Sequence, residues 1–317
     1  MKLTNETGLH PIFVELADKL LNEHPDAQPN KFFVTELAKS EKQIVLQRRH
    51  EHEIERDVQR ACALIEGTAF HSLLEEIAKK HPDKYISEKR IEMELAPGIT
   101  ISGQFDMLDK ETWEIIDYKN TKLAAIDKAE NGNDWKWYNQ AMIYSILIGH
   151  EFNDKPRPIK ARFLAMAKDH SFVKASSDPS YPKYPMREVV FDLSDPVEAG
   201  SILEAYRYKA IRVKELLENG LEPNECTYDD MWCTEDWAIM KPDAKKAHKC
   251  FDNPDKALEY YMSLDESSRD KMRIYHRISD ATNCKAYCPC AEFCEQGKKA
   301  RDMEKIVEDV TDIIIPF

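Results

Sequence analysis

Three residues, Asp106, Asp117 and Lys119, have the types and spacing best suited to chemistry. Carboxylate oxygens are preferred ligands of hard cations such as Mg²⁺ and Mn²⁺. Such an ion can activate water and stabilise the charge on a phosphoryl group during its transfer. Asp117 and Lys119 are two residues apart, so on a β-strand they share a face. We therefore interpret the three residues as a metal site; the alternative is an exposed strand with solvated charges.

A β-hairpin is predicted to carry these residues. The apolar runs 99–108 and 113–118 are rich in β-branched and aromatic residues, and a polar turn separates them. A further strand is expected at 85–95, before a turn that contains proline and glycine. The hairpin would place Asp106 and Asp117 at similar depth on neighbouring strands.

Two predicted helices flank the hairpin. The first, residues 53–80, carries His71, and the second, residues 135–149, carries Gln140 and Tyr144 four residues apart on one face. Polar side chains on an apolar helix need hydrogen-bond partners if they are buried. The simpler interpretation is a packed or solvated histidine, a satisfied amide and a core tyrosine.

The remaining pattern predicts an α/β fold, with a mixed central sheet flanked by helices. Further strands are expected at 159–167 and 188–193, followed by a long helix that ends before Gly220. Two domains are expected, a core with N-terminal helices at residues 1–220 and a Cys-rich, mainly helical module at 221–317.

Cysteines are concentrated in the last third of the chain. The run CKAYCPCAEFCEQ, which starts at Cys284, holds four cysteines within eleven residues. Buried cysteines without a ligand are common, but such density beside a proline favours metal or cluster ligation. In a reducing compartment these residues are expected to be thiols or metal ligands rather than disulfides.

Composition excludes several classes of protein. The net charge of −13, from 45 basic and 58 acidic residues, counts against a protein that coats nucleic acid non-specifically. The negative net charge is still compatible with an enzyme that has a local basic groove beside a metal site. Nine glycines are too few for a typical glycine-loop nucleotide site. No membrane span or signal peptide is evident, so we expect a cytoplasmic protein.

The order of these motifs resembles the PD-(D/E)XK nuclease superfamily, specifically its RecB-like branch. The motifs in question are a helix with His71, strands with Asp106 and Asp117-x-Lys119, and a helix with Gln140-x-x-x-Tyr144. The Cys-rich tail resembles members with an iron–sulfur cluster, such as the AddB nuclease domain and the CRISPR-associated adaptation nuclease. The resemblance extends to phage-encoded relatives of this kind, and it covers roughly residues 33–296. It implies a restriction-endonuclease-like core.

The resemblance also implies roles for the residues. Asp106 and Asp117 would hold Mg²⁺ or Mn²⁺, with His71 as an additional ligand. Lys119 would orient or activate the attacking water and stabilise the developing charge.

By the same resemblance, Gln140 and Tyr144 would position the active site or the DNA strand. The implied function is metal-dependent hydrolysis of DNA, as an exonuclease in replication, recombination or end processing. A non-catalytic DNA-binding or scaffold subunit is the alternative, and a nuclease subunit active only beside a helicase or recombinase is a third interpretation.

For the Cys-rich tail, the resemblance implies a 4Fe–4S cluster. Its implied ligands are Cys226, Cys284, Cys288 and Cys294. Cys233 is a second candidate for the upstream ligand, and the extra Cys290 leaves the ligand set open. Four thiolates can equally hold Zn²⁺.

The last residues, 313–317, end in Ile-Pro-Phe behind acidic residues. They resemble the acidic tip of bacterial single-stranded DNA-binding proteins, which implies docking on a helicase, a recombinase or another replication protein. The alternative is that this segment packs on the core or forms an edge strand.

Overall fold

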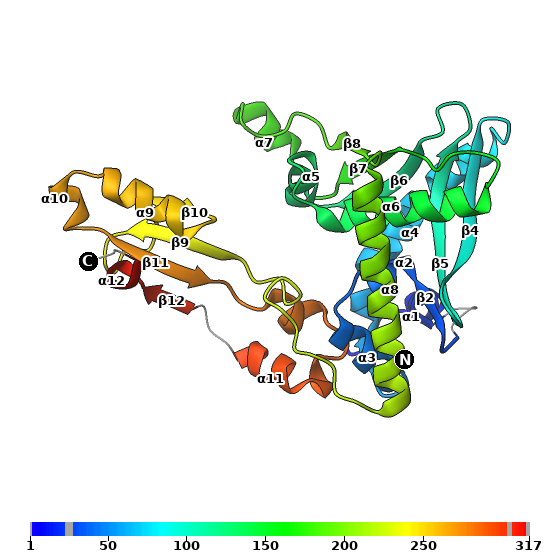
Figure 1. Ribbon diagram of the computed structural model, residues 1–317, viewed down its shortest axis with the longest axis horizontal. Coiled ribbons are helices and arrows are strands. Elements are labelled where there is room, and N and C mark those ends of the chain that lie inside the picture. The colour runs from blue at the N-terminus through cyan, green and yellow to red at the C-terminus, as the bar shows by residue number, and fades with distance from the viewer. Residues whose placement is uncertain (1, 23–27, 303–305, 315–317) are drawn as a thin grey trace. The chain divides into compact units, whose positions relative to one another are not determined.

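The computed structural model describes residues 2–22, 28–302 and 306–314, which form two compact units (Figure 1). The first unit comprises the described residues up to Val45 together with Glu51–Glu222, and the second comprises Leu46–His50 and the described residues from Pro223 onward. The assignment of Leu46–His50 to the second unit was not anticipated from the sequence.

A six-stranded mixed sheet forms the centre of the first unit. Its order is β2-β5-β6-β7-β8, with β4 paired to β5. The β2–β5 and β6–β7 pairs are parallel, and the other pairs are antiparallel. The strands are β2 (Lys31–Phe33), β4 (Tyr85–Ala96), β5 (Ile99–Asp109), β6 (Ile115–Thr121), β7 (Lys160–Ala167) and β8 (Met186–Asp192). The predicted mixed central sheet and its hairpin are therefore confirmed.

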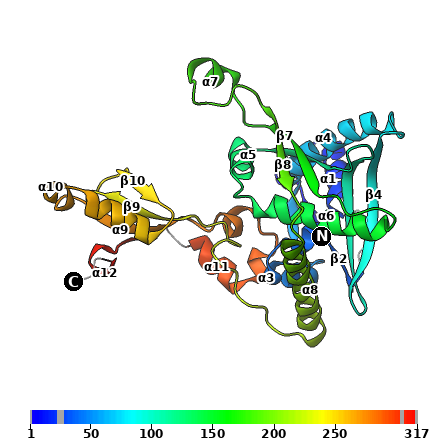
Figure 2. The same ribbon diagram turned by 45° about the horizontal axis from the view of Figure 1, so that its top comes forward.

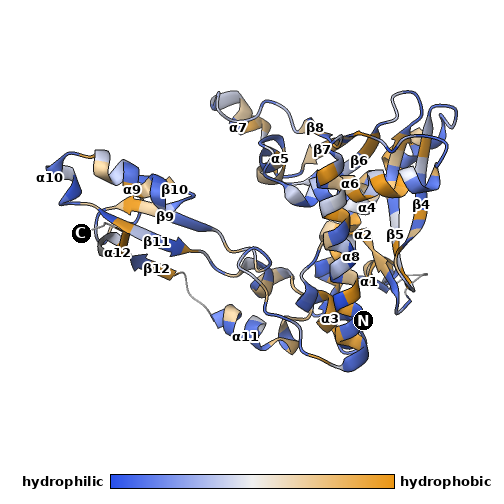
Figure 3. Ribbon diagram, viewed as in Figure 1, coloured by the Kyte–Doolittle hydropathy of each residue, from blue (hydrophilic) through white to orange (hydrophobic). Residues whose placement is uncertain are grey.

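Helices flank this sheet, as predicted. They are α1 (Pro11–Asn22), α2 (Val34–Leu37), α3 (Glu41–Arg49), α4 (Cys62–Lys79), α5 (Leu123–Glu130), α6 (Trp135–Glu151), α7 (Phe172–Ser177) and α8 (Pro196–Asn219). Hydrophobic residues run along α6 (Figure 3), and Ile143 and Leu147 share one core cluster with Phe105 and Phe163 of the sheet. A separate cluster joins α4 to Tyr118 of β6.

Local signals explain where the main helices begin and end. The side chain of Asp134 accepts hydrogen bonds from two backbone N–H groups in the first turn of α6, each at 3.1 Å. Asp195 caps α8 in the same way, with Pro196 at the first helical position. Gly220 ends α8 with a φ of 64°, a left-handed conformation that glycine adopts without a steric penalty.

The prediction of one continuous helix over residues 53–80 was wrong for the first part of that range. Glu55–Asp57 form strand β3, which pairs in parallel with β1 (Lys2–Thr4), and a 3-10 helix follows at Val58–Ala61. The carboxylate of Asp57 accepts a hydrogen bond from Gln59 N–H at 2.9 Å, and this cap starts the helical backbone only after the strand.

The second unit holds a four-stranded antiparallel sheet in addition to its helices. The expectation of a mainly helical module did not include this sheet. The sheet order is β10-β9-β11-β12. The elements are β9 (Glu235–Met240), β10 (Lys249–Phe251), α9 (Pro254–Ser263), α10 (Glu266–Arg269), β11 (Arg273–Ile278), a π-helix (Asn283–Tyr287), a 3-10 helix (Ala291–Phe293), α11 (Glu295–Asp302), β12 (Ile306–Asp309) and α12 (Thr311–Ile314). Ile239 and Ile274 of the sheet pack with Ala257 and Tyr261 of α9.

None of the helices within 2–22, 28–302 and 306–314 combines the length and hydrophobicity that a transmembrane span requires. Of the predicted docking segment 313–317, Ile313 and Ile314 belong to α12, and residues 315–317 lie outside the described residues, so the docking stays a prediction.

Candidate active site

The site lies where the hairpin strands β5 and β6 part. These strands have only two paired positions, Met107 with Ile116 and Leu108 with Ile115. Just beyond them, the N–H of Tyr118 donates a hydrogen bond to Oδ2 of Asp106 at 2.7 Å. A side chain thus binds a backbone group at the point where the ladder stops, and the carboxylate of Asp106 is fixed beside the opening.

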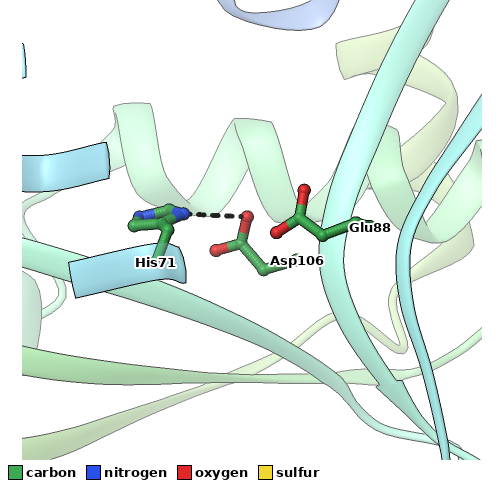
Figure 4. Close-up of side chains that lie close together, drawn as sticks. All are labelled: His71, Glu88 and Asp106. Carbon is green, nitrogen blue, oxygen red and sulfur yellow. Dashed lines mark ion pairs between the residues drawn. The ribbon is translucent and has the colours of Figure 1, made fainter. Parts of the chain in front are cut away.

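Three ligand-type side chains from three elements meet at this opening. His71 of α4, Glu88 of β4 and Asp106 of β5 each offer one atom, and these atoms all lie within 4.8 Å of one another. Figure 4 shows the carboxylates of Glu88 and Asp106 turned toward each other, with the His71 ring facing Asp106. His71 Nδ1 is 3.4 Å from Asp106 Oδ1. One imidazole nitrogen and two carboxylates are a donor set that suits a divalent cation.

Glu88 was missed by the sequence analysis. It has a φ of 50°, a left-handed conformation that costs a residue with a Cβ about 1–2 kcal/mol. Gln104 donates a hydrogen bond to Glu88 Oε2 at 2.5 Å, which fixes the carboxylate toward the site. A glycine or asparagine would have signalled such a backbone position, but a glutamate inside an alternating strand gives no such signal.

A second set of predicted residues lies at the same hairpin, on β6 and α6. Asp117 is buried, and its Oδ2 lies 2.6 Å from Lys119 Nζ, as expected for residues on one strand face. Gln140 joins the pair: its Oε1 accepts a hydrogen bond from Lys119 at 3.2 Å, and its Nε2 donates to Asp117 Oδ1 at 3.4 Å. Nε2 also lies 3.4 Å from the hydroxyl of Tyr144.

Gly103 explains how α6 comes close enough to make these contacts. A Cβ atom at this position would lie 2.7 Å from Cε1 of Tyr144 and 2.9 Å from Cγ2 of Val34. Both distances are below van der Waals contact, so a larger residue on β5 would push α6 away. The glycine therefore sets the position of Gln140 and Tyr144 relative to the sheet.

The electrostatics of the site fit a bound cation. Burial raises the pKa of Asp117 to about 6, although the ammonium group of Lys119 opposes this shift. Burial also raises the pKa of Glu88. Burial lowers the pKa of His71, but the hydrogen bond and charge of Asp106 outweigh it and leave this pKa above its ordinary value. Clustered carboxylates disfavour their own ionisation, and a divalent cation would offset that repulsion.

In the second unit, the cysteines predicted to bind a cluster lie in one neighbourhood. The pKa of Cys284 is raised to about 11, first by burial and then by the thiols of Cys288, Cys226, Cys294 and Cys233. Within the described part of the chain, however, no three cysteine sulfurs gather closely enough to hold a single ion.

Other contacts fix the positions of individual cysteines. Cys290, the extra cysteine of the motif, has its sulfur 3.5 Å from that of Cys288. The amide side chain of Gln296 bonds both the N–H and the C=O of Cys226, each at 2.8 Å. The N–H of Gly297 donates to Cys294 Sγ at 3.2 Å.

A mixed sheet flanked by helices, with two acidic residues and a lysine on its central hairpin, defines a restriction-endonuclease-like α/β core. The sequence profile of the PD-(D/E)XK nuclease superfamily matches residues 10–295, and the chain belongs to this superfamily.

Among solved structures, the chain is similar to SSO0001, with 14% sequence identity and a TM-score of 0.44 over 64% of this chain and 85% of that one. It is also similar to an alkaline exonuclease (LHK-Exo) from Laribacter hongkongensis, with 12% identity and a TM-score of 0.36 over 60% of this chain and 93% of that one. No curated protein sequence matches the chain.

Proposed function

We propose that the protein is a metal-dependent DNA nuclease of the RecB-like type, which hydrolyses phosphodiester bonds as an exonuclease. The observation that carries the proposal is the convergence of His71, Glu88 and Asp106 at the hairpin that also carries the Asp117–Lys119 pair. Membership of the nuclease superfamily supports the reaction class. The order of the motifs, rather than any measured contact, supports the RecB-like branch and the exonuclease activity.

Each group has a distinct task in this proposal. His71, Glu88 and Asp106 would hold Mg²⁺ or Mn²⁺, with Asp117 beside them. When bound, the ion would polarise the scissile phosphate and lower the pKa of the attacking water. Lys119 places an ammonium group next to Asp117, where it orients the water and offsets the negative charge that develops on the phosphate.

Gln140 is a positioning residue in this scheme. Its oxygen accepts from Lys119 while its nitrogen donates to Asp117, so it fixes the direction of both groups. Tyr144 supports this amide from within α6. A non-catalytic DNA-binding subunit would have no need of the buried ion pair, whose desolvation is costly. The retained pair therefore favours the enzyme over a scaffold.

The test is incubation of the purified full chain with 5′- or 3′-labelled single- and double-stranded DNA, in Mg²⁺, Mn²⁺ or EDTA. Mononucleotides or short oligonucleotides released from one end, and abolished by EDTA, are expected. Internal cleavage of circular DNA would replace the exonuclease with an endonuclease. Binding without cleavage in either metal would refute the enzyme and favour the scaffold.

We propose in addition that Cys226, Cys284, Cys288 and Cys294 bind a 4Fe–4S cluster. The closeness of the other three thiols to Cys284 supports a shared centre. Four thiolates can equally hold Zn²⁺, so metal analysis separates the two.

Iron and sulfide analysis of anaerobically purified protein tests the cluster. Cys284→Ser should lose the iron and the visible absorption, whereas Cys250→Ser should keep both, because Cys250 is an exposed residue of β10. Stoichiometric zinc in a colourless protein would refute the iron–sulfur proposal.

A further inference from the structure

The connection between β7 and β8, residues 168–185, exposes large apolar side chains. Phe172, Val173 and Tyr184 are 67%, 78% and 60% exposed, and Met186 at the start of β8 is 69% exposed. Figures 1 and 2 both show α7, which this connection contains, projecting beyond the ends of β7 and β8. We call residues 168–185 the β7–β8 excursion. Exposed rings gathered on one projecting element are typical of a binding surface.

Internal contacts hold the excursion in shape. His170 Nε2 lies 2.8 Å from the carbonyl oxygen of Pro182, and the N–H of Ser171 donates to the hydroxyl of Tyr181 at 3.0 Å. The ring of His170 packs edge-on against Phe172 at a centroid distance of 4.9 Å, and it is tilted against the ring of Tyr181 at 5.3 Å. Phe172 is thus supported on one side while most of its surface faces solvent.

The base of the excursion is attached to the elements of the candidate active site. The N–H of Lys168 donates to the carbonyl of Thr121 at 2.8 Å. Thr121 lies two residues beyond Lys119 on β6, which corresponds to roughly 7 Å along a strand. The ammonium group of Lys168 also pairs at 3.1 Å with Glu66 of α4, the helix that carries His71.

Lysines accompany the rings. Lys183 Nζ lies 5.2 Å from the ring centroid of Tyr184, and Lys174 Nζ lies 5.7 Å from that of Tyr181. Both carboxylates of the excursion accept backbone hydrogen bonds, Asp169 from Leu123 and Asp178 from Ser180. The excursion contains three lysines and two aspartates in a chain whose net charge is −13. Rings with adjacent ammonium groups suit a strand in which bases and phosphates alternate.

We propose that the β7–β8 excursion binds the unpaired bases of a single DNA strand, which stack on Phe172 and Tyr184 while Lys174 and Lys183 contact its phosphates. The surface directs the strand toward the neighbouring hairpin and gives the nuclease a preference for single-stranded ends. This inference rests on the proposed nuclease function and names its substrate.

The experiment measures fluorescence anisotropy of a labelled oligo(dT) strand and of a blunt duplex of equal length, with the full chain in EDTA so that no cleavage occurs. The variant is Phe172→Ser/Tyr184→Ser. The control is Tyr208→Ser on α8, which removes a ring that is 71% exposed outside the excursion. Loss of one stacked base costs about tenfold in affinity, so the double variant should bind oligo(dT) about 100-fold more weakly, while the control binds normally.

Two further measurements separate this inference from the proposed function. Lys174→Ala/Lys183→Ala should reduce the slope of log affinity against log salt by about 1.4, since each phosphate contact on a single strand contributes about 0.7. Hydrolysis of a small chromogenic ester, thymidine 5′-(p-nitrophenyl phosphate), should be unchanged in the Phe172→Ser/Tyr184→Ser variant, because that substrate does not reach the excursion.

Several outcomes overturn the inference. Unchanged binding of oligo(dT) by the ring variant shows that the surface does not bind the strand. Equal losses on oligo(dT) and on blunt duplex show that it does not bind unpaired bases, and loss of ester hydrolysis shows that the rings support the fold instead. If wild-type protein binds oligo(dT) through these rings but hydrolyses neither DNA nor the ester, the inference stands and the nuclease proposal fails.

Discussion

The two carboxylate oxygens of Asp106 make different contacts, one with the backbone of β6 and one with His71 at the candidate metal position. Oδ2 accepts the N–H of Tyr118 at 2.7 Å, and Oδ1 lies 3.4 Å from Nδ1 of His71. The first contact replaces backbone pairing where the hairpin opens, and the second directs an oxygen toward Glu88 and His71. The same side chain that holds the strands apart therefore also faces the candidate metal position.

Asp106→Asn separates these two tasks. The amide oxygen can still accept from Tyr118, but the negative charge is lost, so we expect the hairpin to persist and cleavage in Mn²⁺ to fall about 100-fold or more. Rates on end-labelled DNA and the circular dichroism spectrum check this. Asp109→Asn is the matched control on the same strand, because the side chain of Asp109 caps the turn through Glu111 and Thr112. Full activity of Asp106→Asn would remove Asp106 from the site.

Lys119→Gln should reduce cleavage by about 100- to 1,000-fold, since it removes a preorganised cation from the developing charge. It also leaves the buried Asp117 without its ammonium partner, which should raise the pKa of that carboxyl further above 6. Single-turnover rates measure the loss. Lys122→Gln, which changes an exposed lysine just before α5, should cleave at the wild-type rate. Equal rates for the two variants would contradict the role of Lys119.

We expect both variants of Glu88, Glu88→Gly and Glu88→Gln, to bind metal more weakly than wild type. Their free energies of unfolding should differ. Both remove the charge, but only glycine relieves the left-handed backbone, at about 1–2 kcal/mol. In EDTA, we expect Glu88→Gly to have the higher free energy of unfolding of the two, measured in urea. Isothermal titration with Mn²⁺ should show weaker binding in both than in wild type. Undiminished Mn²⁺ affinity would exclude Glu88 as a ligand.

Removal of metal should lower the melting temperature, because an ion that binds only the native state stabilises it. At a free Mn²⁺ concentration of 100 times Kd the gain is about 2.7 kcal/mol, or about 5–10 °C for a unit of this size. His71→Ala should lose most of this shift, and His81→Ala should keep it, because His81 is exposed just after α4. A shift of the same size in both variants would place the ion elsewhere.

The sequence predicted the central part of the fold well because its signals are local. Alternation and turn residues identified the hairpin, and a spacing of two residues was enough to place Asp117 and Lys119 on one face. The pairing of Gln140 with both of them required only that α6 packs on that face. For the hairpin and for Asp117, Lys119 and Gln140, the short-range sequence pattern agrees with the contacts that the fold makes.

Glu88 and the second sheet were missed for physical reasons. The backbone of Glu88 is held in an unfavourable conformation by the strands around it, which no neighbouring residue reveals. Strands β9 (EDWAIM) and β11 (RIYHRI) do not alternate strictly between apolar and polar residues, so the pattern that identified the hairpin is absent from them. The segment from Glu55 to Ala61 matched a helical pattern of apolar residues, but pairing with Lys2–Thr4 made part of it a strand.

The membership of Leu46–His50 in the second unit has a consequence for biosynthesis. Leu46 is buried, and the ring of His50 stacks on Phe293 at a centroid distance of 4.2 Å. The ribosome releases these residues long before it reaches their partner, because the whole first unit beyond Glu51 lies between them. The second unit is therefore unfinished until Phe293 has been translated, which makes it a slow, late step of high contact order. A nascent chain interrupted before Phe293 leaves the second unit incomplete, and such chains should be the ones that chaperones retain.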